Sequence, residues 1–334
     1  MVYLTKQDLN TGVLPDKLLR IFISERCNYN CTFCCWEEPS TKSPKLNPIC
    51  PENLRLVTEA MVESGCHNFQ LTGGEPLLHR WEYLIAVVDA IASTPGVEQF
   101  WIVTNGSLLQ DKRLCEQLYT AGLRRVNISI AAETNEKYQH YSRSGFTLDD
   151  ALKAIRTASD AGIDVHVHTC LNADGVSTYE QLNTLLFAAQ DNGAKNAFYF
   201  EVFSTSEIAQ DFHRLYVNAD DVTEEFLASS KWDVRSTDKG RPYFWNGQMR
   251  VYIPRKRAFV ITDICRLNNC GDYCQGFYAA QLVNDAQGIA VRACQRIFND
   301  DRNLFRIDDA LLERRDMQEL VDMFGYVWRY AYGQ

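Results

Sequence analysis

The chain has 334 residues, of which 46% are hydrophobic and 23% are charged, and its formal net charge at pH 7 is −9. This apolar content excludes a disordered chain, and the length allows one large domain or two ordinary ones. The acidic balance argues against a general nucleic-acid or anionic-membrane binder, although it permits a local basic pocket. No apolar run reaches the roughly 18 residues of a membrane span, and the N-terminus does not resemble a signal peptide. We therefore expect a cytoplasmic protein.

Short β-rich runs alternate with amphipathic helical patterns over the first part of the chain. The expected strands are 19–24, 68–72, 99–104, 125–130, 164–170 and 197–202. The expected helices are 51–64, 81–93, 112–121, 147–161 and 179–192. Repeated strand–helix units predict a parallel sheet covered by helices, and six units are fewer than a closed eight-unit barrel requires. The sequence thus predicts an α/β fold, a partial (β/α)6 barrel that stays open.

The alternation stops after residue 204. Residues 205–247 are predicted to form a connection of helices and loops. Three further strands are expected at 248–253, 279–283 and 289–293, the last two joined by a turn, and a helix is expected over 308–332. We therefore divide the chain into a barrel over 1–204, a connection over 205–247 and a small C-terminal extension over 248–334.

Twelve cysteines are unusual in a chain without a secretion signal, and they are better explained as metal ligands or buried thiols than as disulfides. Cys27, Cys31 and Cys34 have the spacing C-x3-C-x2-C and directly follow the first expected strand. Three thiolates on such a loop can hold three corners of a four-iron cluster and leave one iron open for chemistry. A zinc site would need a fourth ligand, and Cys35, adjacent to Cys34, is a poor candidate.

A second cysteine group lies near the C-terminus. It comprises Cys265, Cys270, Cys274 and Cys294. The hairpin expected between the last two brings the fourth thiol back to the other three, which predicts a second cluster site. Zinc is the competing interpretation, because four cysteines complete a closed tetrahedral site. The remaining cysteines, Cys170 among them, are interpreted as small buried hydrophobes.

The first cysteine motif, with Phe33 before its third cysteine, resembles the signature of the radical S-adenosylmethionine (SAM) enzymes. In that family the open iron binds the amino and carboxylate groups of SAM. One electron then cleaves SAM to a 5′-deoxyadenosyl radical, which abstracts hydrogen from an unactivated carbon. The resemblance implies a [4Fe-4S] cluster and SAM as cofactors, a small-molecule substrate, and a flavodoxin- or ferredoxin-type reductant.

Other motifs match the family in order. Gly73-Gly74-Glu75-Pro76 follows the second strand, where the family binds the methionyl amino group, and Thr104-Asn105-Gly106 follows the third, where it contacts ribose and carboxylate. Positions at or just after the ends of the later strands are weaker matches, where the family contacts the adenine or the ribose. Taken alone, each of these weaker positions also fits ordinary strand-end polarity or core packing. The cofactor-binding residues implied are Phe33, Gly73, Gly74, Glu75, Thr104, Asn105, Ser129, Leu171 and Phe203.

The second cysteine group is similar to the auxiliary-cluster region of enzymes related to the GTP cyclase of molybdenum-cofactor biosynthesis. The resemblance implies a second [4Fe-4S] cluster held by the C-terminal extension. The spacing of Cys265 and Cys270 differs from that group, and Cys294 supplies a fourth thiol. These departures indicate a relative that acts on another substrate, and a specific hypothesis is an enzyme similar to the cytosylglucuronate decarboxylases of nucleoside-antibiotic pathways.

Candidate catalytic side chains lie on the later strands. His166 and His168 alternate on the fifth strand and therefore face the same side, either toward a substrate or outward to helices or solvent. Glu201, at the end of the sixth strand, is a candidate acid, and Glu133 is a weaker one. These residues are the hypothesis for proton transfer or hydrogen bonding to the substrate.

A basic run lies between the barrel and the extension. It consists of Arg250, Arg255, Lys256 and Arg257. In an acidic protein this run is a candidate substrate site for a carboxylate or phosphate, and a solvated strand face is the equal alternative.

The predicted function is radical chemistry on a small polar substrate. The favoured classes are a nucleoside, a nucleotide or a sugar acid, with decarboxylation as one outcome, in natural-product or cofactor biosynthesis. A peptide maturase is the alternative enzyme. Two alternatives come from other classes of protein. An iron–sulfur electron carrier would not cleave SAM, and a zinc-binding regulatory protein would be recognised by metal analysis.

Overall fold

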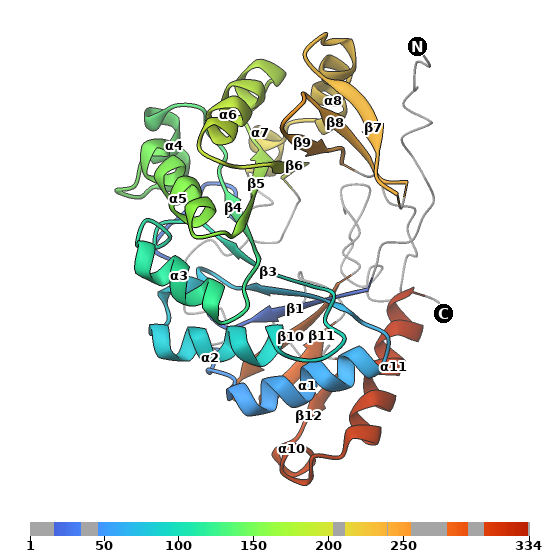
Figure 1. Ribbon diagram of the computed structural model, residues 1–334. Helices are drawn as coiled ribbons and strands as arrows, with labels where there is room; N and C mark the ends of the chain where they lie inside the picture. Colours follow the sequence, from blue (N-terminus) through green and yellow to red (C-terminus); the bar gives the residue numbers. More distant parts are fainter. Residues whose placement is uncertain are drawn as a thin grey trace.

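The computed structural model describes residues 17–34, 46–202, 211–238, 240–254, 279–292 and 304–332. One twelve-stranded open sheet organises these residues, in the order β12-β11-β10-β1-β2-β3-β4-β5-β6-β9-β8-β7 (Figure 1). Because β12 and β7 stand at opposite edges and do not pair, the predicted open barrel is confirmed.

The six central strands are parallel and follow one another in chain order. They are β1 (Leu18–Phe22), β2 (Asn68–Thr72), β3 (Gln99–Thr104), β4 (Arg125–Ser129), β5 (Asp164–Leu171) and β6 (Asn196–Glu201). Each lies within two residues of its predicted bounds. Two further parallel strands flank them, with β9 (Arg250–Tyr252) beside β6 and β10 (Ala279–Asp285) beside β1. Strands from the region assigned to the extension are therefore part of the barrel sheet itself.

The predicted helices cover the outer face of the curved sheet (Figure 1). They are α1 (Pro51–Glu63), α2 (Trp81–Ala92), α3 (Lys112–Thr120), α5 (Leu148–Asp160) and α6 (Tyr179–Asp191). Thr147 and Thr178 begin the last two with capping boxes, which satisfy free backbone N–H groups of the first turn. Apolar residues of the helices and of the outward side of the strands, such as Val57, Ile102 and Val167, form the main core.

Some elements differ from the prediction. The connection after β6 contains α7 (Phe212–Leu215) and α8 (Ala219–Ala228), but also a hairpin of β7 (Asp233–Ser236) and β8 (Pro242–Trp245). These strands have only four residues each, so no local periodicity indicates them; β7 pairs with β8, and β8 pairs with β9, both antiparallel. The polar helix α4 (Asn135–Ser142) was also not predicted.

The C-terminal part returns to the first strand. After β10 follow β11 (Gly288–Arg292), β12 (Phe305–Ile307), α10 (Asp309–Arg314) and α11 (Met317–Tyr332). The single helix predicted over 308–332 is two helices, because Arg315 adopts a left-handed conformation with φ 54°. The indole of Trp328 in α11 donates to Ser64 Oγ at the end of α1 (3.0 Å). No helix within the described ranges has the length and apolarity needed to cross a membrane.

Candidate active site at the carboxyl ends of the strands

The cysteine loop directly follows β1. The backbone N–H groups of Asn30 and Thr32 donate to the carbonyls of Ser142 (2.9 Å) and Tyr141 (2.8 Å), which fixes the loop to the end of α4. Burial, followed by the charges of Cys34 and Cys27, holds the pKa of the Cys31 thiol well above its ordinary value. The structure therefore brings the three predicted ligands together.

The donors of this loop fit an iron–sulfur cluster. Cysteine thiolates are the usual ligands of such clusters, and hydrogen bonds to sulfur tune them. Cys27 Sγ accepts one from the backbone N–H of Tyr29 (3.4 Å) and a longer one from Asn105 Nδ2 (3.8 Å). No three His, Cys, Asp or Glu side chains in the described ranges are grouped to hold a single metal ion. In a cluster, by contrast, each thiolate binds its own iron, so the sulfurs need not converge on one point.

The glycine turn after β2 lies directly against the backbone that leads to the cysteines. Gly74 N donates to the carbonyl of Ser24, and Glu75 N donates to that of Arg26, each at 2.7 Å. A Cβ on Gly73 would lie 2.2 Å from the carbonyl oxygen of Ser24, and one on Gly74 would lie 2.4 Å from that of Arg26. Both positions therefore require glycine, and the turn and the cysteine loop are held as one unit.

The carboxylate of Glu75 points into the protein. It accepts hydrogen bonds from Thr104 Oγ1 (2.7 Å), from the backbone N–H of Asn105 (2.7 Å) and from that of Leu77 (2.9 Å). Burial raises its pKa to about 7. Glu75 and Thr104, both predicted to contact the cofactor, thus join the ends of β2 and β3 through their side chains.

Asn105 connects the end of β3 to the cysteine loop. Its Nδ2 donates to Asn28 Oδ1 (2.8 Å), and Asn28 Nδ2 donates to Ser107 Oγ (2.9 Å). The predicted Thr104-Asn105 motif therefore lies beside Cys27.

An apolar wall lies next to the cysteines. The ring of Phe33 stacks on Tyr141 at 5.4 Å between centroids and packs against a small cluster that includes Cys170, Val202 and Phe212. Cys170 is 7% exposed, as expected for a buried thiol, yet the charge of Cys34 reaches it and adds to the rise of its pKa. Sequence reasoning did not place Cys170 at this site, because a lone cysteine late in a strand gives no such signal.

The register of the strands places two other residues that were predicted to contact the cofactor. Ser129 ends β4 directly beside His168 of β5, whereas Leu171 ends β5 with its side chain fully buried. The register puts Ser129, but not Leu171, on the same face of the sheet as the two histidines.

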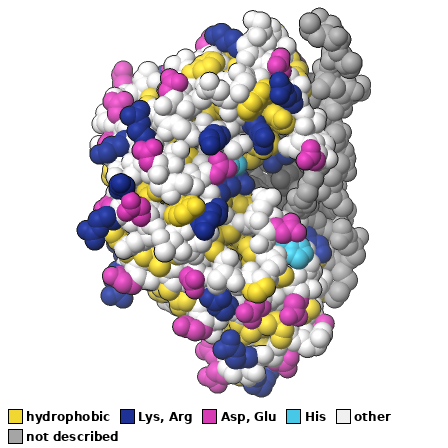
Figure 2. All heavy atoms as spheres, in the orientation of Figure 1, with side chains coloured by type: hydrophobic (Ala, Val, Ile, Leu, Met, Phe, Trp, Pro, Cys, Tyr) yellow, Lys and Arg dark blue, Asp and Glu magenta, His cyan; other side chains and the backbone are white. Residues whose placement is uncertain are grey.

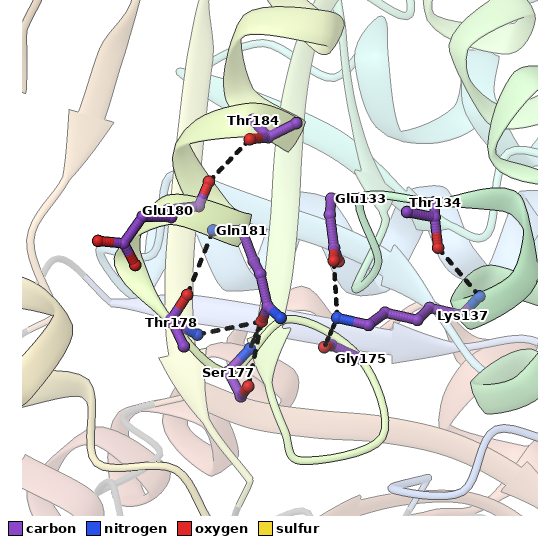
Figure 3. Close-up of polar contacts among 9 residues, drawn as sticks. All are labelled: Glu133, Thr134, Lys137, Gly175, Ser177, Thr178, Glu180, Gln181 and Thr184. Carbon is purple, nitrogen blue, oxygen red and sulfur yellow. Dashed lines mark hydrogen bonds and ion pairs between the residues drawn. The ribbon is translucent and has the colours of Figure 1, made fainter.

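The side chain of Lys137 connects the loops after β4 and β5 (Figure 3). Lys137 Nζ donates to Glu133 Oε1 (2.6 Å) and makes a longer contact with the carbonyl of Gly175 (3.5 Å). Nearby, Gln181 caps α6 by accepting from the backbone of Ser177 and Thr178. Glu133, the weaker candidate acid, thus forms an ion pair with Lys137, which also contacts the loop after β5.

His166 and His168 face the same side of the sheet, and both pack against the ring of Phe198. His166 Nε2 contacts Asp164 Oδ2 (2.7 Å), and His168 Nε2 lies 2.8 Å from Asn127 Nδ2. Burial lowers the pKa of both imidazoles, that of His166 to about 4. At neutral pH both rings are therefore uncharged.

Glu201 lies elsewhere. Its Oε1 accepts from Tyr216 Oη (3.1 Å) and from the backbone N–H of Ala219 (2.9 Å) at the start of α8. The structure thus does not bring the third predicted catalytic residue together with the two histidines, and gives its carboxylate a helix-capping contact instead.

The low pKa of His166 predicts a pH-dependent stability. Below pH 6.5 the unfolded chain protonates this imidazole, whereas the folded protein does so only near pH 4. The stability that the neutral His166 imidazole contributes to the folded protein is therefore complete above pH 6.5 and declines as the pH falls toward 4. Between pH 7 and pH 5 it should decrease by about 2 kcal/mol. Urea unfolding of wild type and of His166→Gln at both pH values measures it, and an identical pH dependence in the two proteins would contradict it.

The basic run is only partly within the described residues. Arg250 is exposed at the start of β9, paired with Asn196 at the start of β6. It borders a groove of about 440 Å³ together with Asp164, Lys195 and Trp245. This is the amino-terminal end of the strands, opposite to the cysteine loop. The predicted residues that lie outside the described ranges are Phe203, Arg255, Lys256, Arg257, Cys265, Cys270, Cys274 and Cys294.

The chain is similar to a known protein family and to known enzymes. The family model described as "Radical SAM superfamily" matches residues 21–188, half of the chain. A GTP 3′,8-cyclase of Thermodesulfovibrio yellowstonii is 34% identical over 43% of this chain and 44% of its own. One of Pseudomonas savastanoi is 30% identical over 68% of this chain and 67% of its own. The chain thus spans less than half of the first relative's length.

A solved structure shares the fold. SuiB of Streptococcus suis bound to S-adenosylmethionine superimposes with a TM-score of 0.61 at 13% identity, over 93% of this chain and 67% of SuiB. The parallel sheet with its outer helices is common to both. Since the superfamily model covers half of the chain and includes the cysteine loop and the glycine turn, the chain belongs to the radical SAM superfamily.

Proposed function

We propose that the protein cleaves SAM reductively to a 5′-deoxyadenosyl radical and abstracts hydrogen from a small polar substrate. The observation that carries this proposal is the meeting of Cys27, the Gly73-Gly74 turn and Asn105 at the carboxyl ends of β1, β2 and β3. In open parallel sheets this edge is where ligands bind.

Each residue of the edge has a distinct task. Cys27, Cys31 and Cys34 would hold a [4Fe-4S] cluster, which supplies the electron for SAM cleavage when bound. Asn105 orients Cys27 and the loop around it through Asn28. The glycines allow backbone groups to approach closely, and Phe33 supplies an apolar surface suited to a purine ring.

For the substrate we propose a nucleoside, a nucleotide or a sugar acid, with decarboxylation as the reaction of a sugar acid in natural-product or cofactor biosynthesis. Polar side chains on the face of the sheet turned away from α1 to α6, including Asn127, His166 and His168, support a polar ligand. The name of the curated relatives, GTP 3′,8-cyclase, supports a nucleotide-like compound.

We further propose a second cluster held by Cys265, Cys270, Cys274 and Cys294. The pairing of β10 with β11 supports it, because Gln281 lies opposite Arg292. The chain thus enters β10 and leaves β11 at one end of the hairpin. Cys274 shortly precedes this entry, and Cys294 shortly follows this exit.

Anaerobic reconstitution tests the proposal. With dithionite and SAM, the protein should form 5′-deoxyadenosine and carry about eight irons per chain, and changing the four C-terminal cysteines together to alanine should leave about four. About four irons in the wild type would remove the second cluster and keep the enzyme. Intact clusters without cleavage, also with a stronger reductant, would contradict the proposal and favour an electron carrier. Stimulation by peptides alone would favour a peptide maturase.

A further inference from the structure

Two arginines lie close to one aromatic ring on the face of the sheet that is turned away from α1 to α6. Arg125 Cζ lies 5.8 Å from the ring centroid of Phe198 and 4.6 Å from that of Trp101. Arg241 Cζ lies 4.7 Å from Phe198 and 4.4 Å from Tyr252. The register puts Arg125 opposite Asp164 and on the face of the two histidines. Two cations therefore share one aromatic surface in a protein whose net charge is −9.

The charge of Arg125 is not neutralised by a contact within the described ranges. Its Nε donates to the neutral Asn127 Oδ1 (3.0 Å), and its Nη groups have no hydrogen-bond partner there. Asp164 acts on Arg125 electrostatically, but no ion pair joins the two within these ranges; its carboxylate contacts His166 (2.7 Å), and its side chain is 43% exposed. Burial lowers the pKa of Arg125 to about 10, so it stays charged at neutral pH. Arg125 is half-buried, and withdrawing a cation from water costs free energy unless an anion pairs with it.

One further N–H group in the neighbourhood lacks a partner among the described residues. The indole nitrogen of Trp101 is buried and has no acceptor within these ranges, and the whole residue is 9% exposed. The charges of Arg20, Arg125 and Arg241 all reach His168, which adds to the lowering of its pKa. Positive charge thus gathers on this face of the sheet, next to an indole N–H that has no acceptor within the described ranges.

We propose that Arg125 and Arg241, with the indole N–H of Trp101, form an anion-binding subsite that holds a carboxylate or phosphate group of the substrate. Arginine is suited to this task because its planar fork binds both groups with two parallel hydrogen bonds. The subsite rests on the proposed function, because it names the charged end of that enzyme's substrate.

The position of the subsite also limits the size of the substrate. Arg125 begins β4 and Ser129 ends it, so the two lie roughly 13 Å apart along the strand. In the space-filling view, several Lys and Arg side chains gather near the middle of the face shown, with Asp and Glu side chains among them (Figure 2). A substrate anchored at Arg125 and reacting near the strand ends has the length of a sugar derivative or a nucleotide.

Calorimetry on the reconstituted protein tests this subsite with three defined probes: glucuronate, glucose 6-phosphate and uncharged glucose. At least one anion should bind 10-fold or more tightly than glucose. Arg125→Gln should weaken that binding roughly 10- to 100-fold, the range expected for hydrogen bonds to a charged group. Trp101→Phe keeps the ring and removes the N–H, so it should give a smaller loss in the same direction. Iron content and circular dichroism show whether each variant is folded.

Arg124→Gln is the matched control. Arg124 is adjacent in sequence but exposed, and its Nη1 donates to the carbonyl of Tyr119 (2.6 Å). This variant should bind the anions and cleave SAM as wild type does. A preference for glucuronate assigns the subsite to a carboxylate, and a preference for glucose 6-phosphate assigns it to a phosphate.

The subsite and the proposed function fail separately. If wild type cleaves SAM but binds neither anion better than glucose, the subsite is wrong and the enzyme stands. Equal anion binding by wild type, Arg125→Gln and Trp101→Phe also overturns the subsite. If anion binding depends on Arg125 but SAM is not cleaved, the subsite stands and the radical reaction is wrong.

Discussion

Cys31→Ala is expected to abolish the formation of 5′-deoxyadenosine and to remove about four irons per chain. Cys31 is the middle ligand of the loop, and both Cys27 and Cys34 lie close enough to influence its ionisation. Two remaining thiolates are too few to hold the cluster at this edge. Iron analysis and chromatographic detection of 5′-deoxyadenosine after reduction with dithionite measure the effect.

Cys50→Ala is the control for the cysteine variant. Cys50 is exposed and contacts Glu52 (2.6 Å), away from the loop. Its removal should change neither iron content nor cleavage. Cleavage retained by Cys31→Ala would show that the first cluster has been assigned to the wrong ligands.

Gly74→Ala is expected to lower the rate of SAM cleavage by about 100-fold, because a displacement near 1 Å costs that much in a positioned site. The added Cβ would lie 2.4 Å from the carbonyl oxygen of Arg26 and 2.6 Å from that of Glu25. Both neighbours are backbone, so either the turn or the cysteine loop must move. Calorimetric titration with SAM should show weaker binding, and single-turnover assays should show the lower rate.

Gly145→Ala separates this steric effect from the general loss of a glycine. A Cβ at Gly145 would meet nothing within 4 Å, and its φ is not positive. This variant should bind and cleave SAM like wild type. If Gly74→Ala also behaved like wild type, the contact between the glycine turn and the cysteine loop would not matter for the reaction.

The fold follows from local patterns where the strands and helices are long and apolar. Strands such as β3, with four consecutive apolar residues after its first, have helices on one side and the barrel interior on the other. The hairpin β7–β8 consists of two four-residue strands, and β7 is largely exposed, so its sequence has no apolar alternation long enough to indicate a strand. Likewise, the polar α4 owes its place to contacts with the cysteine loop.

The candidate site, too, was predictable only where its features are local in the sequence. The cysteine spacing and the glycine turn are local features and were predicted. The inward carboxylate of Glu75 and the helix-capping carboxylate of Glu201 depend on partners remote in sequence, and no motif reveals them. Arg125 was missed although a signal exists. Arg125, Asn127 and Ser129 alternate with apolar residues in a central parallel strand, which indicates a polar barrel interior.

The pairing of β10 with β1 has a consequence for synthesis on the ribosome. Leu18 lies beside Ala279, so one edge of the strand that carries the cysteine loop is covered by a segment translated much later. Until then that edge presents unpaired backbone groups, which favour association with other strands. Contacts of such long sequence separation also form slowly. A nascent chain halted before β10 should therefore aggregate readily, and folding of the half-barrel should depend on chaperones that shield this edge until translation has passed residue 285.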